Sequence, residues 1–99
     1  MTQTEVVREW LKNRRSVYFF LPNGSYGRPF DNQYYVDEVQ ELNEGFSIHF
    51  TDGSVLRFNG DVAVLEAEAK LIIESFRICE FEIDGEIKYE FNYGHVSLS

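Results

Sequence analysis

The sequence predicts a mainly β (α+β) protein, with an N-terminal helix packed on seven or eight mostly antiparallel strands. Three observations support this fold class. Helical spacing of apolar residues is confined to residues 1–15, apolar and polar residues alternate over most of 16–99, and Asn, Asp and Gly separate the alternating runs. Many short strands with short turns favour a small barrel or a strongly curved sheet capped by the helix. Because the chain has 99 residues, we expect a single domain, 1–99.

The first residues carry the signals of a helix start. Residues 2–5, T-Q-T-E, fit a capping box with Thr2 as N-cap and Glu5 three residues later. The apolar residues that follow recur at i, i+3 and i+4, which predicts a helix over about residues 3–14. The side chains expected to face the sheet are Val6, Val7, Trp10 and Leu11. We interpret Trp10 as a core residue rather than a platform for a ligand.

The first two strands are predicted on either side of a long loop. Residues 16–21, S-V-Y-F-F-L, are β-branched and aromatic. Because both faces of this run are apolar, we expect a central strand that the helix covers. Residues 34–42 predict the second strand, with a bulge near Asp37 and Glu38 where the alternation changes phase.

Two hairpin loops follow. A three-residue loop over 43–45, with Gly45 in a left-handed conformation, predicts that Leu42 pairs with Phe46. The next turn, T-D-G-S over 51–54, allows two registers. A two-residue Asp-Gly turn sets Phe50 against Val55, whereas a longer loop sets Ile48 and Phe50 beside two later apolar residues, Leu56 and Phe58. We favour the longer loop because register follows the buried face.

The remaining chain is predicted as strands. Residues 62–70 combine a strand-favouring V-A-V-L with a helix-favouring E-A-E-A-K, and we favour a strand followed by a turn because the apolar stripe of a helix would be narrow. Strands follow over 71–76 and 77–84. A three-residue turn containing Asp84 and Gly85 would keep the apolar faces of 77–84 and 87–93 together. The last strand is 95–98.

The segment 21–32, L-P-N-G-S-Y-G-R-P-F-D-N, contains both prolines of the chain. The prolines fix φ and the glycines allow positive φ, so we expect a shaped loop rather than a flexible linker. The loop-shaping residues are Pro22, Gly24, Gly27 and Pro29. The candidate ligand- or partner-binding residues are Tyr26, Arg28, Asp31 and Asn32.

Arg28 has two interpretations. In the first, its guanidinium donates to Asp31 or to carbonyls of the loop and holds the loop closed. In the second, it faces a carboxylate or phosphate of a ligand or partner. The two differ in what an Arg28→Ala variant loses, which is stability in the first case and binding in the second.

The same segment carries a resemblance. The matching residues are Leu21, Pro22, Gly24, Gly27, Arg28, Pro29, Asp31 and Asn32, with Tyr93, Gly94, Val96 and Leu98 near the end. In these positions the chain resembles small uncharacterised bacterial proteins that share an L-P-x-G-x-x-G-R-P-x-D-N segment and a β-rich remainder. Those proteins often have tryptophan where this chain has Ser25 or Tyr26. The resemblance implies a shared architecture, without an assigned activity.

Charge and composition exclude several classes of protein. The net charge is −8, and residues 31–99 hold fifteen of the seventeen acids but four of the nine bases. An acidic body repels phosphate backbones, so we expect no nucleic-acid binding. The longest apolar run, 17–21, is too short to span a bilayer, and charges at Glu5, Arg8 and Glu9 interrupt the position of a signal peptide core. We therefore expect a soluble cytoplasmic protein without membrane contact.

Residues that could carry chemistry are few. The histidines His49 and His95 lie in no recognisable motif, and Cys79 alternates with apolar neighbours as a small core residue does. No metal-ligand spacing occurs, so we expect no metal and no cofactor. The carboxylates of the last strands, which are Glu80, Glu82, Glu86 and Glu90, are interpreted as a solvated face moderated by Lys88.

These observations favour a non-enzymatic protein-interaction module of the inhibitor or immunity type. Its acidic surface and the 21–33 loop would cover a basic protein partner. The alternative is a small-molecule or anion-binding domain centred on Arg28. We find no catalytic constellation and expect no enzyme. A homodimer is also compatible with the sequence, because the strand 95–98 could form an edge that pairs with a second copy.

Overall fold

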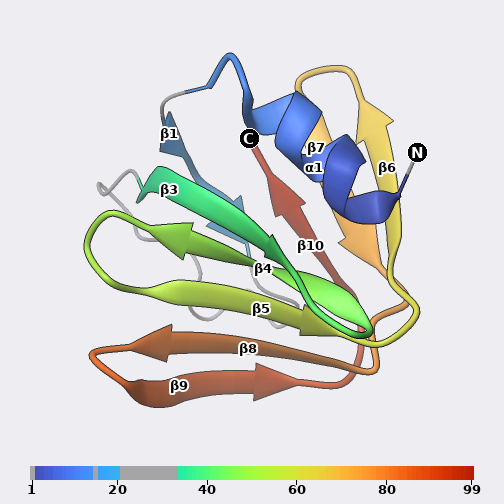
Figure 1. Cartoon of the computed structure of the whole chain (residues 1–99). Coiled ribbons are helices and arrows are strands. Elements are labelled where there is room, and N and C mark those ends of the chain that lie inside the picture. The colour runs from blue at the N-terminus through green and yellow to red at the C-terminus, as the bar shows by residue number, and fades with distance from the viewer. Residues whose placement is uncertain (1, 15, 21–33) are drawn as a thin grey trace.

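The computed structural model describes residues 2–14, 16–20 and 34–99, which form one helix and ten strands (Figure 1). The helix is α1 (Gln3–Leu11). The strands are β1 (Ser16–Val17), β2 (Phe19–Phe20), β3 (Tyr34–Glu41), β4 (Gly45–Phe50), β5 (Val55–Asn59), β6 (Ala63–Ala67), β7 (Lys70–Glu74), β8 (Ile78–Ile83), β9 (Glu86–Phe91) and β10 (His95–Leu98). The mainly β class with one N-terminal helix is therefore confirmed, with ten described strands in place of the seven or eight predicted.

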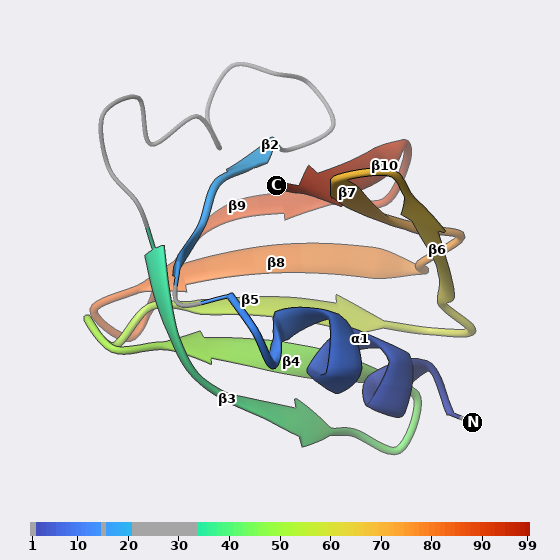
Figure 2. The same ribbon diagram turned by 90° about the horizontal axis from the view of Figure 1, so that it is seen from above.

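The described strands form two antiparallel sheets rather than a closed barrel. The six-stranded sheet has the order β1-β3-β4-β5-β8-β9, and the four-stranded sheet has the order β2-β10-β7-β6. Only Tyr18 separates β1 from β2, so one extended segment leaves the first sheet and enters the second. Figure 2 shows α1 in the space between β3 and β6, which belong to different sheets.

The predicted central strand over 16–21 is wrong, because its two halves lie at the edges of different sheets. Val17 and Phe19 are fully buried, whereas Tyr18 between them is 36% exposed. The backbone of Tyr18 exchanges two hydrogen bonds with Ser99, at 3.1 and 2.9 Å. The apolar character of this segment therefore reflects its contacts with two sheets rather than burial in the middle of one.

The helix confirms the predicted start and corrects the predicted end. The Glu5 backbone N–H donates to Thr2 Oγ1 at 3.1 Å, and the Thr2 backbone N–H donates to Glu5 Oε1 at 3.3 Å, which completes the capping box. The helix ends at Leu11 rather than near residue 14. Arg14 lies beyond the helix but still contacts Trp10, four residues earlier. Its guanidinium lies 3.8 Å from the Trp10 ring centre and donates to the Trp10 carbonyl at 2.8 Å.

Aromatic residues fill the space between the sheets, as the alternation predicts. The Phe19 ring lies 5.2 Å from Phe81 in an edge-on arrangement and 5.8 Å from Phe50 in a stacked one. Such offset and edge contacts are the preferred aromatic geometries. Among the predicted core residues, Phe46, Ile48 and Phe81 are at most 1% exposed. Trp10 is also buried and belongs to the core.

The β3–β4 hairpin confirms the predicted bulge and corrects the predicted register. The pairing shifts between Val36 and Glu38, where the bulge was expected. However, Glu41 rather than Leu42 pairs with Phe46, because the loop has two residues, 43–44, instead of three. This register sets the buried side chains of Val39 and Ile48 opposite each other. The predicted register would have paired Ile48 with a glutamine.

The next two hairpins agree with the sequence. Ile48 pairs with Leu56 and Phe46 pairs with Phe58, so the longer loop, over 51–53, is confirmed, with Phe46 rather than Phe50 as the second apolar partner. The predicted strand followed by a turn in 62–70 is also confirmed, since β6 and β7 form a hairpin.

The β8–β9 hairpin brings the predicted apolar faces together only in part, and by a different route. The turn has two residues, Asp84 and Gly85, both with positive φ, and Ile83 pairs with Glu86. The predicted three-residue turn is therefore wrong. A bulge at residue 88 then shifts the register by one, so that Phe81 pairs with Tyr89 and the two apolar faces meet there as predicted. Ile87, before the bulge, instead pairs with Glu82 and is 50% exposed, which corrects its predicted place on the apolar face.

The last strand, β10, lies between β2 and β7 in the four-stranded sheet. β7 pairs with β10 along its whole length, and β2 pairs with it at Ser97 and Leu98, so β10 is not the open edge strand considered from the sequence. A homodimer stays a prediction. The described residues contain no helix with the length and apolar content needed to cross a membrane.

Candidate functional site

The predicted binding residues lie outside the described residues. Tyr26, Arg28, Asp31 and Asn32 all fall in 21–33, as do the loop-shaping residues Pro22, Gly24, Gly27 and Pro29. The described chain stops at Phe20 in β2 and resumes at Tyr34 in β3, which belong to different sheets. The candidate surfaces of the described residues therefore come from other parts of the chain.

The first candidate surface is the side of the six-stranded sheet that faces away from the core, which we call the outer face. Strand register brings residues from β3, β4, β5, β8 and β9 into two adjacent rows on this face. The first row is Gln40, Ser47, Arg57, Glu80 and Glu90, and the second row is Glu38, His49, Val55, Glu82 and Ile87. Successive side chains of a strand point to opposite faces, so these rows alternate with the buried Phe46 and Ile48.

Acidic side chains dominate the outer face. Its single described base, Arg57, donates from Nη1 to Glu80 Oε1 and from Nη2 to Glu82 Oε1, both at 3.3 Å. The three side chains are between 15% and 27% exposed. The remaining carboxylates, Glu38 and Glu90, are exposed and lie at opposite ends of the two rows. The outer face therefore has more negative than positive charge after its ion pairs are formed.

This arrangement corrects the interpretation of the late carboxylates. Glu80 and Glu82 are partly buried and paired with Arg57, rather than solvated. Lys88 instead pairs with Glu86 at 2.8 Å, next to the bulge. The Lys88–Glu86 hydrogen bond lowers the pKa of Glu86 and raises the pKa of Lys88. Both groups face solvent, so we assign the pair little weight in stability.

The outer face also contains a serine–histidine contact that sequence reasoning missed. Ser47 Oγ lies 3.0 Å from His49 Nε2. The signal was present, because an S-x-H pattern in a strand places both side chains on one face. Ser47 is 2% exposed, and the residue opposite His49 is Glu38, whose Oε1 accepts a hydrogen bond from Gln40 at 2.6 Å. The buried hydroxyl is poorly placed for nucleophilic attack, and the contact satisfies a buried polar group.

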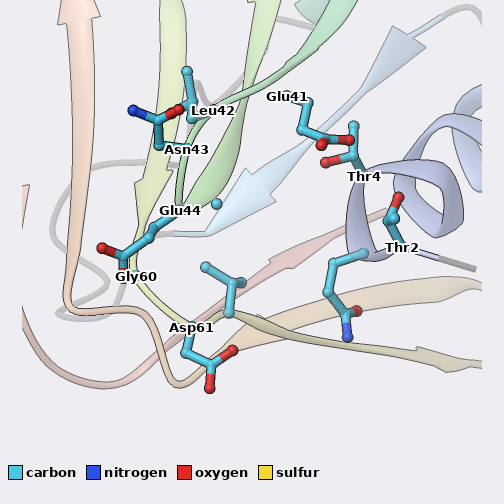
Figure 3. Close-up of a pocket in the computed structure, with 11 residues that line it drawn as sticks. Thr2, Thr4, Glu41, Leu42, Asn43, Glu44, Gly60 and Asp61 are labelled. Carbon is cyan, nitrogen blue, oxygen red and sulfur yellow. The ribbon is translucent and has the colours of Figure 1, made fainter.

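The second candidate surface is a depression of about 410 Å³ at the start of the helix (Figure 3). Its lining residues are Thr2, Gln3, Thr4, Glu41, Leu42, Asn43, Glu44, Gly45, Gly60, Asp61 and Val62. Figure 3 shows Glu41 reaching from the end of β3 toward Thr4 in the helix. One of the lining residues, Glu44, forms an ion pair in which Arg77 Nη1 lies 3.3 Å from Glu44 Oε2. The three acids of the lining, Glu41, Glu44 and Asp61, favour a cationic neighbour. Arg77 of the same chain is such a cation.

A second depression, of about 520 Å³, lies between the helix and β3. Its basic residues mostly serve the fold. Arg8 donates from Nε and Nη2 to the Val39 carbonyl, at 3.2 and 2.8 Å, and Arg14 packs on Trp10. Lys12 is exposed. The opposite wall carries two acids, Asp37 and Glu38, so this depression has no uniform charge that would select one class of ligand.

Other chemically capable residues are buried or dispersed. Cys79 is 0% exposed, and burial raises the pKa of its thiol to about 12, as expected of a core cysteine. The other described histidine, His95, is exposed and pairs in register with Glu74. Within 2–14, 16–20 and 34–99, no three His, Cys, Asp or Glu residues are grouped so that they could hold a metal ion.

Comparisons of the chain with protein-family models, with curated proteins and with solved structures give no match.

Proposed function

We propose that the protein is an interaction module of the inhibitor or immunity type that binds a basic protein through its outer face. The observation that carries this proposal is the excess of carboxylates on that face, where Glu38, Glu80, Glu82 and Glu90 accompany one arginine. The net charge of −8 adds a long-range attraction for a positively charged partner.

The proposal assigns different roles to different parts of the outer face. Arg57 holds Glu80 and Glu82 in fixed positions, so these carboxylates are ordered before a partner arrives. Glu38 and Glu90 are exposed and can form new ion pairs at the two ends of the face. Ile87, which is 50% exposed in the same row as His49, adds apolar area that a partner would bury. The 21–33 segment is retained as a second contact through Arg28.

The test is a native-lysate binding experiment with matched variants. A Glu38→Gln/Glu90→Gln protein removes two charges from the outer face, and a Glu9→Gln/Glu68→Gln protein removes two exposed charges elsewhere. We expect the wild type and the control pair to capture the same basic protein at low salt, and the outer-face variant to lose it. Capture should also decrease near 1 M salt, where the screening length falls to about 3 Å.

Two outcomes would contradict the proposal. In the first, the wild-type protein captures no specific partner at low salt, which contradicts the proposed interaction. Equal loss of the partner in both charge variants would show that net charge, and not the outer face, determines binding. An Arg28→Ala protein in the same experiment tests whether the loop contributes. If that variant loses no partner but loses thermal stabilisation by an added small anion, the anion-binding alternative is favoured.

A further inference from the structure

Among the described residues, three strands have a long edge without a neighbouring strand. In the six-stranded sheet these are β9 and the part of β3 that follows Tyr35, and in the four-stranded sheet the strand is β6. The β3 edge is partly occupied, because Arg8 of α1 donates two hydrogen bonds to the Val39 carbonyl. An unpaired edge presents backbone N–H and C=O groups that can pair with another chain, and proteins commonly block such edges. The β9 and β6 edges differ in whether such a block is present.

The β9 edge is blocked. The bulge at Lys88 interrupts the regular spacing of its backbone groups, because two residues of β9 lie opposite one of β8 at that point. Lys88 and Glu86 also place a charged pair along this edge, at 2.8 Å. A bulge and an edge lysine are two of the usual devices against strand addition.

The β6 edge carries neither device. Its sequence, A-V-L-E-A, contains no proline, lysine or glycine, and its register with β7 is regular over all five pairs. Apart from the ladder with β7, residues 63–67 form no hydrogen bond with another described residue. Figure 2 shows β6 near the rim of the molecule, with β7 and α1 on its inner side. Leu65, in the middle of β6, is 50% exposed.

We propose that a second copy of this chain docks on this edge, through antiparallel pairing of β6 with β6 around a two-fold axis at Leu65. An antiparallel pair of identical strands is self-complementary, as an isologous dimer requires. In this register Leu65 faces Leu65, Val64 faces Glu66, and Ala63 faces Ala67. The glutamates of the two copies are therefore not directly opposite each other, and small alanines occupy both ends.

Neighbouring side chains support the same register. Ile72 of β7 pairs with Leu65, so both lie on the same face of the four-stranded sheet. Joining two copies at Leu65 makes a continuous apolar row of Ile72, Leu65, Leu65 and Ile72 across the two-fold axis. β6 itself carries one charge in five residues, although each chain has a net charge of −8. This edge is therefore suited to a second copy, whereas the outer face is suited to a basic protein.

The expected dimer is weak. Pairing of two five-residue strands buries less than the roughly 1,000 Å² of a stable specific interface. The acidic chains also repel each other, and salt screens that repulsion. We therefore expect association that increases with protein concentration and with salt, the opposite salt dependence from binding of a basic partner.

The first test is sedimentation velocity at about 0.5 M salt, over concentrations from about 10 μM to about 1 mM. We expect wild type to move from monomer toward dimer. A Leu65→Lys protein should weaken association at least about tenfold, because two like charges would meet at the axis. The matched control is Ile87→Lys on β9, which changes a residue of the same 50% exposure and should associate as wild type does.

A second test gives a positive signal that does not depend on destabilisation. In a Cys79→Ala background, Leu65→Cys places two thiols across the axis, within reach of an intermolecular disulfide. We expect Leu65→Cys to form the covalent dimer at least about tenfold faster than Ile87→Cys under mild oxidation. Wild type that stays monomeric throughout the series, equal effects of the two lysine variants, or equal crosslinking at the two positions would each overturn the proposal.

Discussion

Gly45 is the position at which the hairpin geometry makes the strongest demand on the sequence. It has φ +102°, in a region that residues with a side chain rarely adopt. A Cβ added there would overlap the Phe58 carbonyl oxygen of the neighbouring strand and lie 2.9 Å from the carbonyl carbon. The residues beside this contact, Phe46 and Phe58, pair in register and are 0% exposed. We therefore predict that Gly45→Ala is severely destabilising.

The magnitude follows from comparison with Gly53. That residue has φ +91°, but a Cβ added there meets no atom within 4 Å. Gly53→Ala should thus report backbone strain alone, about 1–2 kcal/mol. Gly45→Ala pays a similar strain and must also separate β4 from β5 beside two buried aromatic rings. Loss of such packing costs about 3–5 kcal/mol, so the total should exceed about 4 kcal/mol.

The assay is urea unfolding of wild type, Gly45→Ala and Gly53→Ala, followed by far-ultraviolet circular dichroism. The free energy of unfolding is obtained from the midpoint and slope of each transition. A domain of this size is commonly stable by about 5–15 kcal/mol, so Gly45→Ala should be marginally folded while Gly53→Ala unfolds cooperatively. Equal destabilisation of the two variants would refute the close approach of Gly45 to Phe58.

Two further predictions follow from the last strands. Burial raises the pKa of Cys79 to about 12 from an ordinary value of 9.0, so above pH 9 the unfolded thiol ionises first and stability falls as pH rises. Urea unfolding at several pH values should show that the free energy of unfolding falls less steeply with pH in Cys79→Ala than in wild type, by about 1.4 kcal/mol per pH unit. Equal dependence on pH in the two proteins would contradict the burial of Cys79. Deletion of Lys88 removes the extra residue of the bulge and leaves the pairs of Phe81 with Tyr89 and of Ile83 with Glu86 intact, so thermal melting should remain cooperative. Deletion of Glu80 instead moves Phe81 or Cys79 to the other face, and equal behaviour of the two deletions would contradict the observed register.

The fold could be predicted from alternation wherever one face of a strand is buried. Register followed the buried face at the pair of Ile48 with Leu56, which decided between the two loops proposed for 51–54. The same criterion placed the apolar residues of 77–84 and of 87–93 on one face, which holds at Phe81 and Tyr89. It did not give the turn, because a two-residue turn followed by a bulge shifts the register as much as a three-residue turn does. Side-chain periodicity contains no information that separates these two solutions.

Other features depended on long-range contacts that local sequence does not encode. The run 16–21 is apolar on both faces, and nothing in it indicates that it divides between two sheets at Tyr18. The ion pairs of Arg57 with Glu80 and Glu82 join residues more than twenty positions apart. The sequence predicted an acidic surface. It could not place that surface on the outer face, because the position depends on the register of five strands. The candidate residues around Arg28 stay a prediction, because they lie outside the described chain.

The segment that crosses from β1 to β2 has a consequence for the order of events during synthesis. Phe19 pairs with Leu98, so one of the earliest strands to be made needs one of the last. Contacts between such distant residues are slow to form, because a long loop must close first. During translation, helix α1 and the meander β3–β5 can associate while the apolar residues of β2 still await a partner. Until β10 has been synthesised, the backbone of β2 lacks the strand with which it pairs.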